Sequence, residues 1–365
     1  MKPMRLVVEA MAADFGGIRT YVEWLLRTWG TAFPDDDLLV VTRADSDLDT
    51  AEHRRRAITV PRPAALGRPL TQSLLTPGIV RDFGADAVLA TLPSTGFRHP
   101  GVPLAVVVHD LRHDIQPEQF SRSRRLLRRV SYRRTYALAD GFIAVSQRTL
   151  DDLTRLYPDT ATRPSIVVHH GADHALEWHG RPGSGPAVTF AHHTNKNPDL
   201  VIDAWAIAQS RGVRLPHLMV VGAGAQRDRL AARIRDKDLA DRVSVAGYLP
   251  NAEFNALMGS ASMIVFPSDF EGFGMPVLEG MLRRVPVVAG PDPAVLEVSG
   301  GHAFVMTEWT AAALADAAGR AVACTPARLD AAHAHAREFT WTRATTQTRA
   351  FLAHLSTTGR EARTT

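Results

Sequence analysis

The stretch between residues 263 and 289 constrains the fold of this chain more than any other part of its sequence. Met263–Phe266 is a short, wholly apolar run of the kind that forms a buried strand. A polar loop with two glycines follows, and Pro276 then stands where a helix can begin, because proline suits the first helical position. The helix predicted after it leads into a second apolar run, residues 285–289. Strand, glycine loop, helix and strand in this order predict one right-handed crossover unit of a parallel sheet.

The loop of this unit is the first candidate for a binding site. It follows a strand at its carboxyl end, where open α/β sheets bind ligands. The free N–H groups at the start of the next helix favour an anion, most often a phosphate. Glu271 and Glu279 lie on either side of that position, and a carboxylate accepts paired hydrogen bonds from hydroxyls such as those of a ribose or a hexose. The pattern suggests a site for a sugar nucleotide, and the plain alternative is an ordinary pair of surface glutamates.

Similar apolar runs recur along the chain and are separated by helical patterns, which argues for parallel, doubly wound sheets. The runs are residues 5–9, 38–42, 87–92, 104–109, 142–145 and 166–168, then 187–191, 217–221, 243–246, 263–266 and 285–289. A segment rich in glycine and proline separates the two groups. We therefore predict an α/β protein with a first domain at 1–175, a linker at 176–186, a second domain at 187–340 and a last helical segment at 341–365.

Composition narrows the class of protein. A chain of 365 residues suits two domains of ordinary size, and 45% hydrophobic with 22% charged residues is typical of a soluble globular protein. No apolar stretch approaches the length that crosses a bilayer, no signal-peptide layout is seen, and the single cysteine fits a reducing compartment. We expect a cytoplasmic location. The formal net charge of +4 is mild, and no nucleic-acid partner is expected.

The segment from Glu271 to Glu279, which reads Glu-Gly-Phe-Gly-Met-Pro-Val-Leu-Glu, resembles the signature of retaining family-4 glycosyltransferases of the GT-B fold. The resemblance implies two Rossmann-like domains that face each other across a cleft, with a tail helix that crosses back to the first domain. It also implies that Glu271 faces the donor sugar and that Glu279 holds the nucleotide ribose. Gly272, Phe273, Gly274 and Met275 would lie against the donor. No cofactor and no metal are expected, because the nucleotide-diphosphate sugar is itself a substrate.

Two motifs of the first domain fit the same resemblance. Gly16 and Gly17 are similar to the family's N-terminal glycine loop, and turn geometry alone is the alternative. His109 ends an apolar run and resembles the histidine that lies near the transferred sugar; the alternative is a structural histidine beside Asp110 as a helix cap. The segment of residues 109–120 resembles that of mannosyl- and rhamnosyl-transferring members.

Two further motifs belong to the second domain. Lys196 and Asn197 match a Lys-Asn pair of the family, so Lys196 would neutralise the diphosphate as a point charge. The loop departs from the family at His192, where arginine is common, and a histidine supplies no reliable charge near pH 7. A metal at the adjacent histidines lacks a third ligand at useful spacing. Tyr248 and Leu249 match the loop that presents backbone groups to the nucleobase.

Residues 122–134 hold seven arginines around three apolar residues. The favoured interpretation is a solvated helix face. The alternative is a basic amphipathic helix that docks on anionic lipid, which would place the protein at the inner face of the plasma membrane.

The sequence thus predicts a metal-independent, retaining hexosyltransferase with Glu271, His109 and Lys196 as catalytic residues. The donor would be a nucleotide-diphosphate sugar, with mannose or rhamnose favoured, and the acceptor an alcohol on a glycan, a lipid-linked molecule or a small molecule. Cell-surface glycan or glycosylated-metabolite synthesis is the expected setting. A non-catalytic sugar-nucleotide scaffold and a nucleotide-sugar epimerase remain alternatives. The nucleobase and the oligomeric state stay open.

Overall fold

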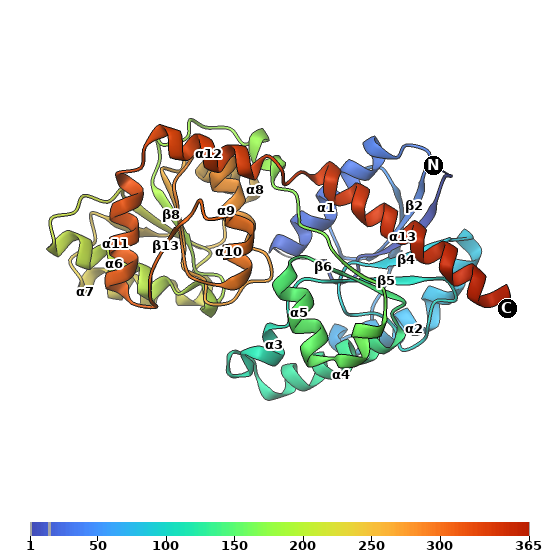
Figure 1. Ribbon diagram of the computed structural model, residues 1–365. Helices are drawn as coiled ribbons and strands as arrows, with labels where there is room; N and C mark the ends of the chain where they lie inside the picture. The colour runs from blue at the N-terminus through green and yellow to red at the C-terminus, as the bar shows by residue number, and fades with distance from the viewer. Residues whose placement is uncertain (1, 14–15, 365) are drawn as a thin grey trace. The chain divides into compact units, whose positions relative to one another are not determined.

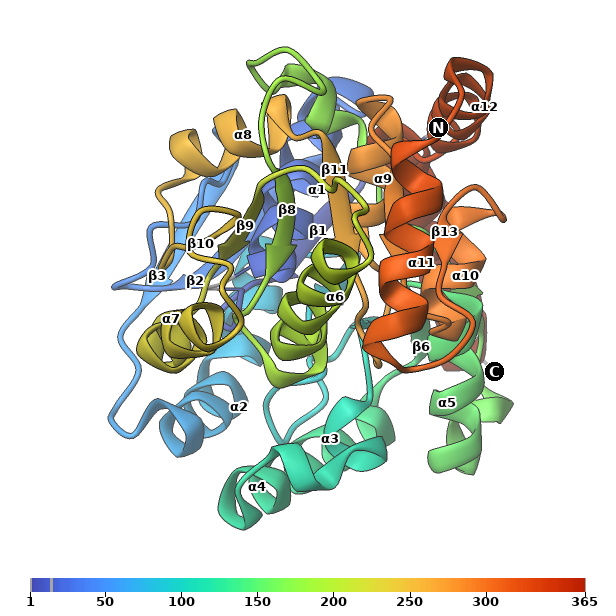
Figure 2. The ribbon, with the colours of Figure 1, turned by 90° about the vertical axis from the view of Figure 1, so that its left-hand side faces the viewer.

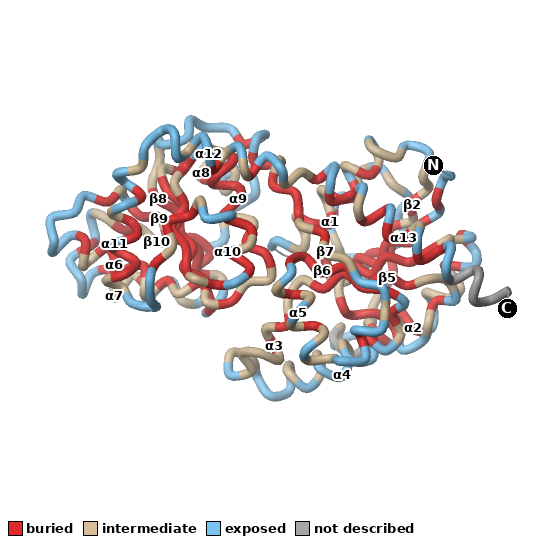
Figure 3. Tube along the Cα trace, in the orientation of Figure 1, coloured by how far each residue is buried: buried red, intermediate tan, exposed pale blue. Residues whose placement is uncertain are grey.

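The computed structural model describes residues 2–13 and 16–364, which form two compact units (Figure 1). The first unit comprises residues 1–171 together with 341–365, and the second comprises residues 172–340. Each unit is built around one parallel sheet. Figure 3 shows the strands of both sheets as the buried centre of their unit.

The first unit has a seven-stranded sheet in the order β3-β2-β1-β4-β5-β6-β7, and all neighbouring strands are parallel. Its strands are β1 Arg5–Glu9, β2 Asp37–Arg43, β3 Arg54–Ile58, β4 Ala87–Ala90, β5 Leu104–Val108, β6 Gly141–Ala144 and β7 Ser165–Val167. Its helices are α1 Gly16–Ala32, α2 Ala64–Phe83, α3 Arg112–Ile115, α4 Arg122–Leu138, α5 Gln147–Leu156 and α13 Trp341–Thr364, with short 3₁₀ turns η1 Pro117–Gln119 and η2 Pro158–Thr162.

The central strands of this sheet are apolar on both faces because helices cover both faces. Every residue of β4 and β5 is buried. Helices α1 and α13 pack together on one face, and α4 and α5 cover the other (Figure 1). Arg349 fixes α13 through an ion pair with Asp36, whose Oδ2 lies 2.6 Å from its Nε.

The second unit has a six-stranded parallel sheet in the order β10-β9-β8-β11-β12-β13. The strands are β8 Ala187–Phe190, β9 Leu218–Val221, β10 Val243–Val245, β11 Met263–Phe266, β12 Val287–Ala289 and β13 Phe304–Val305. The helices are α6 Pro198–Ser210, α7 Arg227–Asp236, α8 Asn251–Ser260, α9 Met275–Leu282, α10 Pro293–Ser299, α11 Ala311–Val322 and α12 Pro326–Ala336, with 3₁₀ turns η3 Asp173–Glu177, η4 Thr194–Lys196 and η5 Gly224–Gln226.

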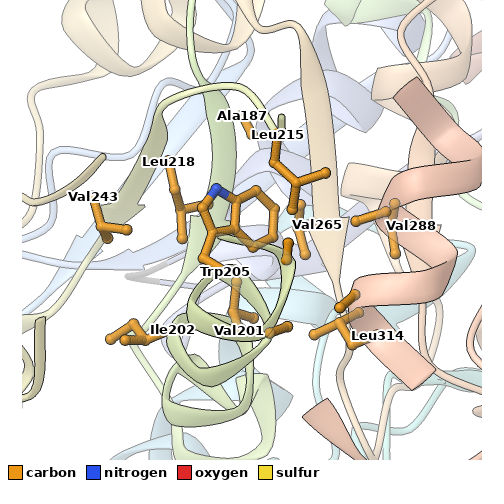
Figure 4. Packing of buried hydrophobic residues seen from close by; sticks show 14 of the residues in the cluster. Ala187, Val201, Ile202, Trp205, Leu215, Leu218, Val243, Val265, Val288 and Leu314 are labelled. Atoms are coloured by element: carbon orange, nitrogen blue, oxygen red, sulfur yellow. The ribbon is translucent and has the colours of Figure 1, made fainter. Parts of the chain in front are cut away.

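Helices α6 and α11 lie side by side in this unit (Figure 2). The core beneath them centres on Trp205, which is 2% exposed and packs among Leu215, Leu218 and Leu314 (Figure 4). Its indole Nε1 donates a hydrogen bond of 3.0 Å to the carbonyl of Pro216. The large side chain therefore anchors α6 while its one polar atom stays satisfied.

Both sheets share the strand order of a doubly wound fold, so the crossover direction reverses between β1 and β4 and again between β8 and β11. Ligands of such sheets bind at this switch point, beyond the carboxyl ends of the strands. The loops after β8 and β11 are the ones that carry Lys196 and Glu271. The topology therefore brings these two predicted residues to the same edge of the second sheet.

The domain limits differ from those predicted. The first unit ends at residue 171 rather than 175, and the segment expected as a linker, residues 176–186, belongs to the second unit. Its glycines lie against the end of α8: the N–H of Gly185 donates to the carbonyl of Ser260 at 2.7 Å, and that of Gly183 donates to Ala261 at 2.9 Å. A Cβ on Gly185 would lie 2.7 Å from the hydroxyl of Ser260, so the close approach requires glycine there, whereas Gly183 takes the left-handed φ of +83° that favours glycine. The last helix, α13, is part of the first unit.

Candidate functional site

The loop between β11 and α9 forms the centre of the candidate site. Gly274 takes the left-handed φ of +98° at the start of α9, a conformation that favours glycine. A Cβ at this position would also lie 3.3 Å from Val295. Pro276 stands in the first turn of the helix, as predicted. The first N–H groups of α9 thus lie next to Gly272, Phe273 and Met275, which the sequence assigned to the donor.

Glu271 lies on this loop and accepts several hydrogen bonds. Its Oε1 forms an ion pair with Nζ of Lys196, accepts from the hydroxyl of Ser268, and accepts from Nδ2 of Asn195 at 3.2 Å. The side chains of Lys196 and Glu271 are only 9% and 14% exposed. The Lys196 ammonium also lies 4.4 Å above the ring of Phe266. The structure therefore brings Glu271 and Lys196 together, with the ammonium neutralised by the carboxylate.

Asn195 and Ser268 complete this network, and the sequence interpretation did not single them out for it. Asn195 donates to the Phe270 carbonyl at 2.8 Å and to the Ser268 hydroxyl at 2.9 Å. Ser268 is fully buried, and its hydroxyl oxygen also lies 3.0 Å from the carbonyl oxygen of Asn195. The two residues thereby join the loop after β8 to the loop after β11 and hold the Glu271 carboxylate in place. Their positions next to Lys196 and shortly before Glu271 were the available signal.

Glu279 lies within helix α9 and is 6% exposed. Its Oε1 accepts a hydrogen bond of 3.1 Å from Nε2 of His174, a residue of η3 that packs edge-on against Trp178. A buried carboxylate needs such partners, because an unpaired charge is costly to bury. The sequence interpretation did not single out His174, since 105 residues separate it from Glu279.

The loops after β8, β9 and β10 meet beside this centre. The N–H of Gly222 donates to the carbonyl of Gly247 at 3.0 Å. A Cβ on Gly222 would lie 3.2 Å from the Cβ of His192, and one on Gly224 would lie 3.4 Å from the ring of Tyr248. His192 is half-buried, and Tyr248 is 74% exposed. These contacts place His192 and Tyr248 at neighbouring loops, as expected of one binding edge.

Leu249 is half-buried in the same loop as Tyr248. His192 and His193 lie with their ring centres 4.9 Å apart. Within residues 2–13 and 16–364, no group of three histidine, cysteine or acidic side chains is arranged to hold a metal ion.

The first unit places its predicted residues separately. Gly16 has a φ of +57° and opens α1 with Gly17 beside it, while the two residues before them lie outside the described part of the chain. His109 follows β5, and its Nε2 donates to the carbonyl of Thr91 at 2.9 Å. Asp110 accepts a hydrogen bond of 3.0 Å from the N–H of Arg112, whereas the N-cap residue of α3 is Leu111, so Asp110 is not the helix cap that the alternative expects.

His109 belongs to an aromatic cluster that the sequence did not indicate. Its ring lies 5.1 Å from that of Tyr21 and 5.4 Å from that of His170, and His170 stacks on Trp341 at 5.9 Å. Burial lowers the pKa of His109 and lowers that of His170 well below its ordinary value. Both rings are therefore neutral at pH 7. Because the one N–H of His109 already donates to Thr91, its Nδ1 can accept a hydrogen bond but the ring supplies no charge.

The chain consists of two Rossmann-like units, each built on a parallel sheet, and loops that can bind a ligand lie at the switch point of the second sheet. This architecture is the GT-B fold of the α/β class. Residues 187–323 match the sequence model of glycosyl transferases group 1, and residues 15–176 match that of glycosyltransferase family 4. The chain thus combines a family-4 domain with a group-1 domain, and its homologues are glycosyltransferases of the GT-B fold.

Curated relatives agree over part of the chain. A 2-deoxystreptamine N-acetyl-D-glucosaminyltransferase of Streptomyces fradiae is 28% identical over 240 residues, which cover 61% of this chain and 57% of that one. A 2-deoxystreptamine glucosyltransferase of Streptomyces kanamyceticus is 30% identical over 158 residues, 43% of this chain and 40% of the other. An O-antigen chain mannosyltransferase B of Escherichia coli is 33% identical over 28% of each chain. The chain spans about half the length of the first relatives it matches.

Solved structures agree over nearly the whole chain. A sucrose-phosphate synthase of Thermosynechococcus elongatus has a TM-score of 0.70 and 19% identity, with 98% of this chain and 99% of that one covered. The Anabaena protein Alr3699/HepE, crystallised with UDP and glucose, also has a TM-score of 0.70 and 19% identity, with 96% and 100% covered. At this identity the likeness establishes the fold.

Proposed function

We propose that the protein is a retaining glycosyltransferase that moves a hexose from a nucleotide-diphosphate sugar to an alcohol. The observation that carries the proposal is the pair of acids at the two ends of the β11–α9 loop and helix. Glu271 is held beside a lysine, and Glu279 is buried beside a histidine. The matches to two glycosyltransferase domains support the same reaction class.

In this proposal the donor's diphosphate lies at residues 272–274 and the first N–H groups of α9. Breaking the sugar–phosphate bond leaves negative charge on the diphosphate, which backbone donors and an ammonium stabilise. The Lys196 ammonium supplies this charge once the diphosphate draws it from Glu271. Glu271 then accepts from sugar hydroxyls and stabilises positive charge on the ring, while Glu279 accepts from the ribose.

His109 is proposed to contact the transferred sugar through a neutral imidazole, as the resemblance implies. The leaving phosphate accepts the proton of the acceptor hydroxyl, so no side chain of the protein has to form a bond to the sugar. This front-side route retains the configuration of the sugar.

The donor screen follows from the relatives. UDP-glucose and UDP-N-acetylglucosamine come first, because UDP lies in the Anabaena protein and the Streptomyces relatives are named for glucose and N-acetylglucosamine transfer. GDP-mannose and dTDP-rhamnose follow, because a mannosyltransferase is among the relatives and the sequence favoured these sugars. 2-Deoxystreptamine and a lipid-linked glycan are the acceptors to try.

The test is nucleotide release with each donor, with and without acceptor. Acceptor-dependent release that disappears in Glu271→Ala supports the proposal, and α-anomeric product from an α-linked donor supports retention. Binding of the donor without any release would favour the non-catalytic scaffold that the altered residue at His192 suggests. A new sugar nucleotide formed without acceptor would favour the epimerase instead.

A peripheral membrane contact through residues 122–134 is a second proposal. Leu126 and Val130 of α4 are 64% and 56% exposed among the arginines, so the helix presents apolar as well as basic groups to its surroundings. Within the described residues, no helix is long and apolar enough to span a bilayer. Vesicles with anionic lipid should retain the protein at low salt, and no salt-sensitive retention would remove this option.

A further inference from the structure

A cavity of about 350 Å³ opens in the helical layer of the first unit. Its lining residues come from α4, the end of α5 and the turn η2. Four arginines line it: Arg125, Arg129, Arg133 and Arg163. Its volume falls in the range of pockets that hold small molecules, which is about 300–1,000 Å³.

The charge around this cavity is unbalanced. Arg125, Arg129 and Arg133 are spaced four residues apart, so they project from the same face of α4. Arg129 lies 4.0 Å from Asp114, whereas the guanidinium groups of Arg125 and Arg133 have no side-chain partner within the described part of the chain. Asp159 is the second acid of the lining. Four guanidinium groups therefore face two carboxylates, and like charges held this close favour an anion between them.

The floor of the cavity carries a polar atom without a partner. The Tyr136 side chain is 2% exposed, and its hydroxyl is buried with no hydrogen-bond partner among the described residues. Its ring is held edge-on against Tyr157 at 4.8 Å and Phe142 at 5.8 Å. Buried hydroxyls in folded proteins almost always have a partner. The Tyr136 hydroxyl is shielded from the cavity, so a bound group reaches it only when the neighbouring side chains of the lining shift.

The remaining groups define the shape of the site. The Tyr157 hydroxyl donates to Asp114 at 2.6 Å. Arg163 donates to the carbonyls of Tyr136 and Ala137, at 3.2 Å for the latter, and so is anchored to the end of α4. Leu156 and Pro158 add apolar wall. The anchored guanidinium of Arg163, the guanidinium groups of Arg125 and Arg133 and the apolar wall together suit an anionic group that carries a compact organic substituent.

We infer that this cavity binds the phosphate of a phosphate ester, with Arg125 and Arg133 contacting the phosphate oxygens and the Tyr136 hydroxyl donating to one of them. Guanidinium groups match phosphate in geometry and stay charged at every physiological pH. The cavity is larger than a bare phosphate needs, which favours an ester. The inference goes beyond the proposed function and does not depend on it, because no residue of the β11–α9 site lines the cavity.

The phosphate could come from a soluble ester or from a lipid headgroup, and the test has one arm for each. Isothermal titration of the full-length chain with sn-glycerol 3-phosphate at low salt tests the first. Flotation with vesicles of phosphatidylcholine containing one-third phosphatidylglycerol tests the second. Both are repeated with Arg125→Ala/Arg133→Ala, with Tyr136→Phe, and with Arg81→Ala, which removes one exposed charge of the first unit outside both α4 and the cavity.

Saturable binding in either arm should weaken at least tenfold in the double variant and about threefold in Tyr136→Phe, and should change less than twofold in Arg81→Ala. It should persist in Lys196→Met, which separates it from donor binding. Loss in the vesicle arm alone identifies a lipid headgroup, and loss in the titration arm alone identifies a soluble ester. Absence of saturable binding in both arms overturns the inference, and so does an equal loss in Arg81→Ala, which would indicate general charge attraction. Tyr136→Phe serves as the test if the double variant does not fold.

Discussion

Replacing Glu271 by glutamine is expected to tighten the binding of a nucleoside diphosphate while abolishing sugar transfer. The Lys196 ammonium is paired with the Glu271 carboxylate, and both side chains are at least 86% buried. A diphosphate must compete with that carboxylate for the ammonium. The amide of glutamine can still accept from Ser268 and Asn195, but it exerts far less attraction on the lysine.

The size of the effect follows from the Coulomb energy of the pair. Two unit charges about 4 Å apart attract by about 4 kcal/mol at an effective dielectric constant of 20. Part of this energy offsets desolvation of the two ions, so a net gain of about 1–2 kcal/mol is expected for the diphosphate. That corresponds to roughly tenfold tighter binding. Lys196→Met removes the charge that the diphosphate needs and should weaken binding about tenfold or more.

Isothermal titration with the diphosphate that gives the largest thermal shift measures both changes. Asp316→Asn is the matched control, because it removes one negative charge from an exposed ion pair with Arg211 in the same unit. It should leave the affinity unchanged. Glu271→Gln and Lys196→Met that shift the affinity in the same direction would refute the reasoning, and so would Glu271→Gln that still transfers sugar.

Three further predictions concern stability. Burial raises the pKa of Glu9 to about 7 from 4.5, so the protonated side chain adds about 3 kcal/mol to the free energy of unfolding below pH 4.5, and this is lost as the pH rises to 7. Glu9→Gln should remove the loss, which urea titrations at pH 5 and pH 8 would measure; a Glu9→Gln effect of equal size at both pH values would contradict the prediction. Gly280→Ala should lower the melting temperature, because the new Cβ would lie 2.8 Å from two side chains of β11 and β12. Gly319→Ala is the control: its Cβ would lie 3.8 Å from the nearest side chain, so the change should raise the free energy of unfolding by about 0.5–1 kcal/mol. Equal shifts of the melting temperature in the two variants would count against the packing argument. Arg349→Met should cost about 3–5 kcal/mol in chemical denaturation, because it leaves the buried Asp36 carboxylate without its partner, and a loss under 1 kcal/mol would show that the pair is not needed.

The buried strands were predictable because they are short apolar runs. Residues 104–109 and 263–266 read as strands, and the structure has β5 at Leu104–Val108 and β11 at Met263–Phe266. Strand β3, Arg54–Ile58, was not predicted, because it begins with three exposed arginines. It exists by pairing with β2 at the edge of the sheet, a context that local sequence does not reveal. Helix α2 carries two internal prolines and was missed for a similar reason.

The site was predictable to the level of single loops, but not to the level of contacts. Glu271 and Lys196 were each assigned to the donor, and 75 residues separate them. Only the neighbouring positions of β8 and β11 in the sheet explain why they form an ion pair. The partner of Glu279 is His174, which lies just before the segment expected to be a linker. The composition of that segment predicted a linker, whereas its hydrogen bonds to the end of α8 make it part of the second unit.

We propose that Glu279 binds the ribose hydroxyls of the donor nucleotide, while Glu271 binds the hydroxyls of the sugar that is transferred. The most direct measurement is a cycle of affinities that combines Glu279→Gln with a nucleoside diphosphate lacking the 2′ and 3′ hydroxyls. We expect Glu279→Gln to weaken binding of the normal diphosphate at least tenfold and to leave binding of the dideoxy ligand unchanged. The reason is that the carboxylate contributes to affinity only by accepting hydrogen bonds from the 2′ and 3′ hydroxyls. Equal losses with both ligands would contradict it, since Glu279 would then only support the fold.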